Sequence, residues 1–98
     1  MNDVRTRRLR RLDTPERRER RMTVLLAMCV AGPGAVLPAD FIRRNLTAPV
    51  PALGRVLYSL KARGLVEGVN PRPAYRHGNY YDGWRITDAG WDEFPDVD

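Results

Sequence analysis

Proline and glycine residues divide this chain into short segments, which limits it to helices and strands of modest length. The sequence "GPG" at residues 32–34 ends a first apolar segment, and Pro38 and Pro51 each open another. Gly64 is well placed for the left-handed residue that often follows a helix. Because 98 residues can bury one small core and no second one, these segments are expected to pack into a single domain.

Capping residues and apolar spacing predict three helices. Thr14 is a good N-cap for the first, Pro15 fits its first helical position, and residues 32–34 stop it. The second is shorter and opens with Pro38, and the third has Pro51 in its first position and runs to residue 63. The side chains predicted to face the core are Met22, Leu25, Leu26 and Cys29 in the first helix, Phe41 or Ile42 with Leu46 in the second, and Leu53, Val56, Leu57 and Leu60 in the third.

Val24 and Met28 form a second apolar stripe on another side of the first helix. Two interpretations of this stripe have equal weight. Either it is the contact of a homodimer, or a neighbouring strand of the same chain covers it.

The last third of the chain predicts two strands and a short helix. "LVEGV" and "YYDGWRI" are the strands, and "NPRPAYRHGN" between them is too long for a tight hairpin turn. We therefore expect a protruding, basic, flexible loop that carries Arg72, Arg76 and His77. Thr87 is expected to cap a final helix over "DAGWDEF".

The charge of +5 is unevenly distributed. Residues 1–21 hold nine arginines against four acidic residues, residues 22–86 hold eight basic residues against three acidic ones, and residues 87–98 hold five acidic residues and no basic one. This predicts a disordered basic arm over 1–13, one folded domain over 14–94 and an acidic tail over 95–98. A basic arm and a basic domain indicate a polyanionic partner.

Several classes of protein are disfavoured by the residues themselves. A single cysteine, Cys29, excludes an internal disulfide and a four-cysteine metal site. The apolar run 24–31 is far too short to span a bilayer, and acidic residues precede it, so we expect a core helix in a cytoplasmic protein. No phosphate-binding glycine loop, zinc-ligand spacing or histidine near a nucleophile is present. We therefore expect no enzymatic activity, no cofactor and no metal.

Two stretches resemble winged helix-turn-helix bacterial transcription regulators, with the MarR and PadR groups as the nearest types. They are "DFIRRNLTAPVPALGRVLYSLKARGLVEG", from Asp40 to Gly68, and "YYDGWRITDAGWDEF", from Tyr80 to Phe94. The resemblance implies a mainly α fold with a small two-stranded β-wing, which is the α+β winged helix-turn-helix architecture. It also implies binding to double-stranded DNA.

In such regulators the start of the third helix meets the base edges. Here these positions are Pro49, Val50, Pro51 and Ala52, where the family usually carries Ser, Thr, Arg, Asn or Gln. Val50 and Ala52 are therefore expected to pack on a thymine methyl group, and Arg55 to bind guanine. Tyr58 and Ser59 fit phosphate contacts. Gly54 fits either a close approach of the backbone to DNA or tight packing between helices.

The remaining predicted contacts are to the DNA backbone or the minor groove. Arg17, Arg18, Arg20 and Arg21 are instead expected to pair in solvent with Glu16 and Glu19. The arm is expected to dominate the affinity if its five arginines contact phosphates. The predicted contact residues are Arg43 and Arg44 on the second helix, Arg72, Arg76 and His77 in the wing, and Arg5, Arg7, Arg8, Arg10 and Arg11 in the arm.

Two functions follow from these observations. The first is a small regulator, dimeric, that binds duplex DNA through the third helix, the wing and the arm. The second is a module that docks a protein, or RNA, through the apolar start of the third helix. The basic arm and wing favour the first, and the apolar turn favours the second.

Overall fold

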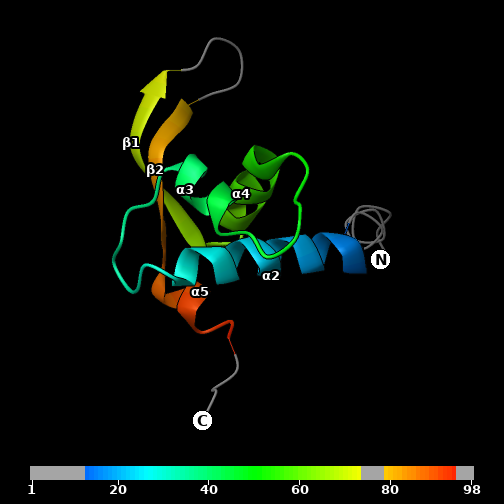
Figure 1. Cartoon of the computed structure of the whole chain (residues 1–98). Coiled ribbons are helices and arrows are strands. Elements are labelled where there is room, and N and C mark those ends of the chain that lie inside the picture. The colour runs from blue at the N-terminus through cyan, green and yellow to red at the C-terminus, as the bar shows by residue number, and fades with distance from the viewer. Residues whose placement is uncertain (1–12, 74–78, 95–98) are drawn as a thin grey trace, which may run out of the picture.

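A computed structural model describes residues 13–73 and 79–94. Within these residues the chain forms a small α+β domain with four helices and a two-stranded antiparallel sheet (Figure 1). The architecture is compatible with a winged helix. The elements in chain order are α2 (Pro15–Cys29), α3 (Ala39–Arg44), α4 (Leu53–Ala62), β1 (Val66–Pro73), β2 (Asn79–Ile86) and α5 (Asp88–Trp91).

The predicted helix caps at both ends of the chain are confirmed. The Thr14 hydroxyl accepts a hydrogen bond from the backbone N–H of Arg17 at 3.2 Å, and Pro15 occupies the first position of α2. Thr87 caps α5 by accepting from the N–H of Gly90 at 3.1 Å. The helix that it caps is shorter than predicted, since it ends at Trp91.

Helix α4 begins two residues later than predicted. Ala52 has φ 54, a left-handed conformation that cannot continue into a right-handed helix, so Pro51 lies in the preceding turn. The end of α4 follows the prediction, with Gly64 at φ 75. There the N–H of Leu65 donates to the carbonyl of Leu60 at 3.0 Å, and the N–H of Gly64 donates to that of Lys61 at 2.9 Å, the pattern of a Schellman cap.

The buried face of α2 differs in part from the predicted one, although Leu25 is buried as predicted. Val24 and Met28 are 0% and 1% exposed, whereas Leu26 is 49% exposed. Met22 and Cys29 are only partly buried. The reason is that α2 packs against α3, α4 and β2 on the side that carries Val24 and Met28. Of the two interpretations of this stripe, coverage by the same chain is confirmed, with β2 joined by α3 and α4. The homodimer contact through Val24 and Met28 is wrong, because both residues are buried in this core.

The other predicted core positions are largely confirmed. Ile42 on α3 is fully buried, while Phe41, Leu46 and Val56 are partly buried around the core. The hairpin completes one side of the core with Val66, Trp84 and Ile86. The buried side chains of α4 are Leu53, Leu57 and Leu60.

Both strands are longer than predicted and project beyond the helices (Figure 1). Val66 lies opposite Ile86 at the base of the hairpin, and Pro73 lies opposite Asn79. Arg72 is therefore part of a paired strand, not of a flexible tip as predicted. The segment after α2 also reaches the sheet, since Leu37 and Trp84 exchange two backbone hydrogen bonds of 2.8 Å.

Candidate nucleic-acid interface

The outer face of α4 is open to solvent. Leu53, Leu57 and Leu60 turn inward, which leaves Gly54, Arg55 and Tyr58 on the exposed side. A Cβ atom added to Gly54 would meet no described atom within 4 Å. Tight packing between helices therefore does not explain this glycine in the described part of the chain. A close approach of the backbone to DNA stays a prediction.

A groove of about 350 Å³ lies between α2 and α4, and arginines from both helices line it. We call it the α2–α4 groove. Four arginines line the same concave surface, beside the exposed face of α4. Its lining residues are Arg17, Arg20 and Arg21 from α2, Pro51 and Ala52 from the turn, and Arg55, Val56 and Ser59 from α4.

The α2 arginines are the part of this site that sequence reasoning missed. We expected them to pair with acidic residues of the same helix, but Arg21 pairs instead with Asp13, which precedes α2. The pKa of Glu16 lies below its usual value because of hydrogen bonds from its own backbone N–H and from Thr14, with a smaller contribution from Arg20. The useful signal was that Arg17, Arg20 and Arg21 recur at three- and four-residue spacing, which gives them one common face.

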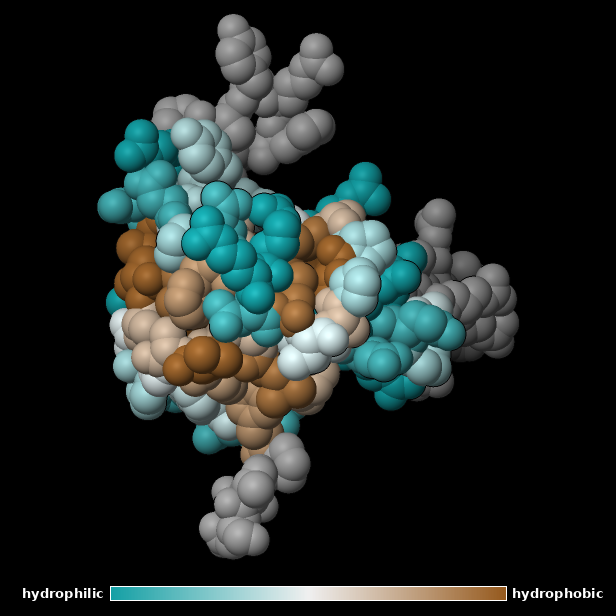
Figure 2. All heavy atoms as spheres, in the orientation of Figure 1, coloured by the Kyte–Doolittle hydropathy of each residue, from teal (hydrophilic) through white to brown (hydrophobic). Residues whose placement is uncertain are grey.

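Figure 2 shows that polar and apolar side chains cover different parts of the molecular surface. Hydrophilic side chains gather over the N-terminal half of α2, and hydrophobic ones lie over its C-terminal half. Arg21 is held in place at this end, because its Nη2 atom lies 2.6 Å from Oδ1 of Asp13 and its side chain is 12% exposed. Because Asp13 does not line the groove, the Arg21 guanidinium is directed to the other side of α2.

The turn before α4 forms a separate depression. Pro49 and Ala52 are exposed, whereas Val50 packs against the core and has only part of its side chain available. A cavity of about 420 Å³ is lined here by Arg43, Leu46, Thr47, Ala48, Pro49 and Val50. The predicted contacts of Val50 and Ala52 with a thymine methyl group stay predictions.

An aromatic cluster joins α4 to the hairpin. The Tyr58 ring lies 5.4 Å from that of Trp84 and 6.0 Å from that of Tyr81, and the Tyr81 and Trp84 centroids are 5.1 Å apart. The Tyr81 ring also covers Gly68, where an added Cβ atom would lie within 2.5 Å of it. Regular strand alternation would place Tyr81 and Trp84 on opposite faces, so the sequence did not predict this cluster.

Tyr58 therefore packs against Tyr81 and Trp84 of the hairpin, in addition to the phosphate contact predicted for it. Lys61, one turn further along α4, lies with Nζ 5.7 Å from the centroid of the Tyr81 ring. Together these contacts fix the position of the outer face of α4 relative to the hairpin. Whether Tyr58 also contacts phosphate stays a prediction.

Two of the predicted backbone-contacting arginines already have acidic partners. The Arg72 Nε atom lies 2.8 Å from Oδ1 of Asp82, and this pair raises the pKa of Arg72. On α3, the Arg43 Nη1 atom lies 2.8 Å from Oδ1 of Asp40. No acidic side chain of the described residues forms an ion pair with Arg44 or Arg55.

The structure brings together Ala52, Arg55 and Ser59 in the α2–α4 groove, and Arg43 and Val50 around the turn cavity. It holds Arg72 in the hairpin, with Asp82 beside it. Arg44 is exposed on α3, and Tyr58 lies in the aromatic cluster beside the hairpin. The other predicted residues lie outside the described part of the chain. They are Arg5, Arg7, Arg8, Arg10 and Arg11 of the arm, and Arg76 and His77 between the two strands.

Comparison with protein-family models, with curated proteins and with solved structures finds no match to this chain. None of the helices in residues 13–73 and 79–94 combines the length and the apolar content needed to cross a lipid bilayer.

Proposed function

We propose that this chain is a winged-helix protein that binds duplex DNA and regulates transcription, with α4 in the major groove. The observation that carries the proposal is the α2–α4 groove, where arginines of α2 flank the exposed face of α4. The order of three helices, a hairpin and a short helix fits this fold. Phosphate neutralisation by such cations supplies much of the affinity of DNA-binding proteins.

The lining of the groove suggests a division of roles. Arg55 is the base reader, because its guanidinium group can donate two hydrogen bonds to the O6 and N7 atoms of guanine. Arg17, Arg20 and Ser59 line the groove beside it and contact phosphates. Such contacts position the helix on DNA but do not recognise the base sequence. The hairpin projects beyond the helices. Its Arg72 contacts the DNA backbone beside the major groove that α4 occupies.

The first experiment separates these roles by fluorescence anisotropy on random duplexes and on a duplex selected from a random pool. Arg55→Ala is expected to lower the preference for the selected duplex, about tenfold or more for a lost bidentate contact. Arg17→Gln with Arg20→Gln is expected to weaken binding to every duplex equally. It should also lower the salt slope by about two, since each phosphate contact contributes about 0.9.

Arg18→Gln is the matched control, because Arg18 belongs to the same helix but does not line the groove. It should leave both affinity and salt slope nearly unchanged. Equal loss of binding in Arg18→Gln and in the double variant would contradict a role for the groove. Stronger binding to duplex RNA than to duplex DNA would contradict the DNA proposal itself.

A second function is favoured by the cavity before α4. Its walls include Leu46, Ala48, Pro49 and Val50, an apolar surface suited to docking a protein segment. Ala48→Asp tests this function better than Val50→Asp, because Ala48 is exposed while Val50 packs against the core. If Ala48→Asp abolishes co-purification of a partner and the unaltered chain does not bind duplex DNA, the docking function replaces the first.

A further inference from the structure

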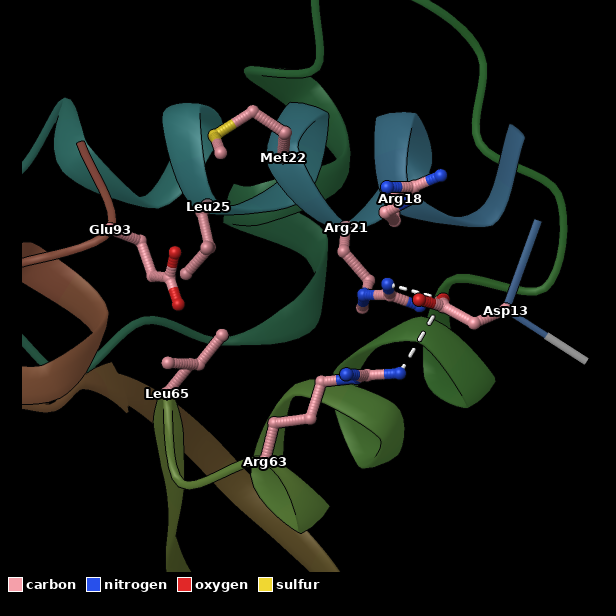
Figure 3. Close-up of a pocket in the computed structure, with 8 residues that line it drawn as sticks. All are labelled: Asp13, Arg18, Arg21, Met22, Leu25, Arg63, Leu65 and Glu93. Atoms are coloured by element: carbon pink, nitrogen blue, oxygen red, sulfur yellow. Dashed lines mark hydrogen bonds and ion pairs between the residues drawn. The ribbon is translucent and has the colours of Figure 1, made fainter. Parts of the chain in front are cut away.

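A second cavity, of about 510 Å³, lies on the other side of α2, between α2, the turn from α4 to β1 and the residues that follow α5 (Figure 3). It is distinct from the α2–α4 groove, although Arg21 lines both. Its lining residues are Asp13, Arg18, Arg21, Met22, Leu25, Arg63, Leu65 and Glu93.

One end of this cavity carries an excess of positive charge. Arg21 and Arg63 both point to Oδ1 of Asp13, at 2.6 and 3.4 Å. Arg18 adds a third guanidinium group near the same carboxylate. The hydrogen bond from Arg21, and the charges of the three arginines, hold the pKa of Asp13 below its usual value. Three guanidinium groups around one carboxylate give this end of the cavity a net positive charge, which favours the binding of a second anion.

The opposite end of the cavity is acidic, and the middle is apolar. Figure 3 shows Glu93 on the far side from the Asp13 cluster, with its carboxylate turned toward the cavity. Leu25 and Leu65 lie between the two ends, and Met22 borders the same space. The cavity is therefore polarised along its length, from three arginines through an apolar middle to one carboxylate.

We propose that this cavity binds a small zwitterion with an apolar body. The carboxylate of the ligand lies against Arg18, Arg21 and Arg63, its hydrocarbon part covers Leu25 and Leu65, and its ammonium group faces Glu93. The size of the cavity is within the range of small-molecule sites. Arginine suits the anionic end, because its guanidinium group pairs with carboxylates in a planar, two-bond geometry.

Ligand binding is expected to weaken DNA binding, and this part rests on the proposed function. Arg21 borders both the cavity and the α2–α4 groove, so an anion in the cavity reduces the positive charge available to a phosphate in the groove. By thermodynamic linkage, DNA must weaken ligand binding by the same factor.

The site is tested by titrating the full chain, without DNA, with 6-aminohexanoate and following backbone amide shifts by NMR. Hexanoate and inorganic phosphate are titrated in parallel. We expect saturable shifts at Arg21, Leu65 and Glu93, and an affinity for 6-aminohexanoate about two- to fivefold above that for hexanoate, as for an exposed ion pair. Phosphate is expected to shift only the arginine end, with lower affinity.

Two substitutions, each with a control, test which residues bind the ammonium end and which bind the carboxylate end of the ligand. Glu93→Gln should abolish the preference for 6-aminohexanoate over hexanoate, while Asp92→Asn, its neighbour outside the cavity, should preserve it. Arg63→Gln should weaken the binding of both ligands severalfold. Lys61→Gln, two residues earlier in the last turn of α4, should weaken the binding of neither. Thermal unfolding of each variant checks that it folds.

Phosphate binding as tightly as 6-aminohexanoate, or an unchanged preference in Glu93→Gln, would overturn the zwitterion site. The coupling is measured separately, as DNA anisotropy with and without 6-aminohexanoate. If the chain binds DNA with the same affinity whether or not 6-aminohexanoate saturates the cavity, the proposed coupling is wrong, but the proposed ligand site is not contradicted. If DNA does not bind at all, the proposed function fails, and the NMR titration alone decides the site.

Discussion

Gly54 is the second residue of α4, in its first turn, where glycine still has a lower helix propensity than alanine. The position has room for a side chain, because an added Cβ atom would meet no described atom within 4 Å. Gly54→Ala is therefore expected to raise the free energy of unfolding by up to about 1 kcal/mol, the value for a helix interior, measured by urea denaturation. The same substitution should lower DNA affinity, because the methyl group lies on the face proposed to enter the groove. A stabilised variant with unchanged DNA affinity would show that the backbone does not approach DNA at this residue.

Asp13 makes folding dependent on pH at the acidic end of the range. Its pKa is lowered in the folded chain below the ordinary value of 3.8, mainly by the hydrogen bond from Arg21. A carboxylate with a depressed folded pKa stabilises the fold above its unfolded pKa, and this stabilisation is lost as pH falls through the folded value. Asp13→Asn should thus lose less stability than the unaltered chain when the pH is lowered from 5 to about 2, as urea denaturation at each pH will measure. Parallel pH profiles for the two proteins would contradict this assignment.

At the scale of elements, the aromatic cluster connects α4 to the hairpin. Tyr81 contacts both Tyr58 on α4 and Trp84 on its own strand. We expect Tyr81→Ala to lower the free energy of unfolding by about 2 kcal/mol, since it removes ring packing from a partly buried position. Tyr80→Ala is the matched control, because Tyr80 is 51% exposed and should change stability by no more than about 0.5 kcal/mol. Equal losses in chemical denaturation would mean that the cluster does not stabilise the domain.

At the scale of the whole molecule, the proposed function requires the basic arm and the α2–α4 groove to act on the same DNA. Replacing the arm residues Arg5, Arg7, Arg8, Arg10 and Arg11 with glutamine should lower the salt slope of DNA binding by up to about 4.5, at about 0.9 per lost phosphate contact. The preference for a selected duplex should change little, because the proposed base reader, Arg55, remains. A salt slope equal to that of the unaltered chain would show that the arm does not contact phosphate.

Features set by neighbouring residues were predictable from the sequence alone. The caps at Thr14 and Thr87 and the left-handed Gly64 each depend on hydrogen bonds within a few residues, so the local sequence suffices. The core stripe of α4 was predictable for the same reason, since its helical period is local. The presence of two strands before the last helix was also evident, although their lengths were not.

Tertiary packing decided the rest, because it depends on which elements meet. Val24 rather than Leu26 is buried since α3, α4 and β2 pack on that side of α2, and no local pattern specifies this choice. The contact of Tyr58 with Tyr81, and the approach of the α2 arginines to Arg55, join residues more than twenty positions apart. The sequence thus determined the helices, their caps and the excess of positive charge. Only the folded chain decided which charges share a surface, because that depends on long-range packing of the apolar faces.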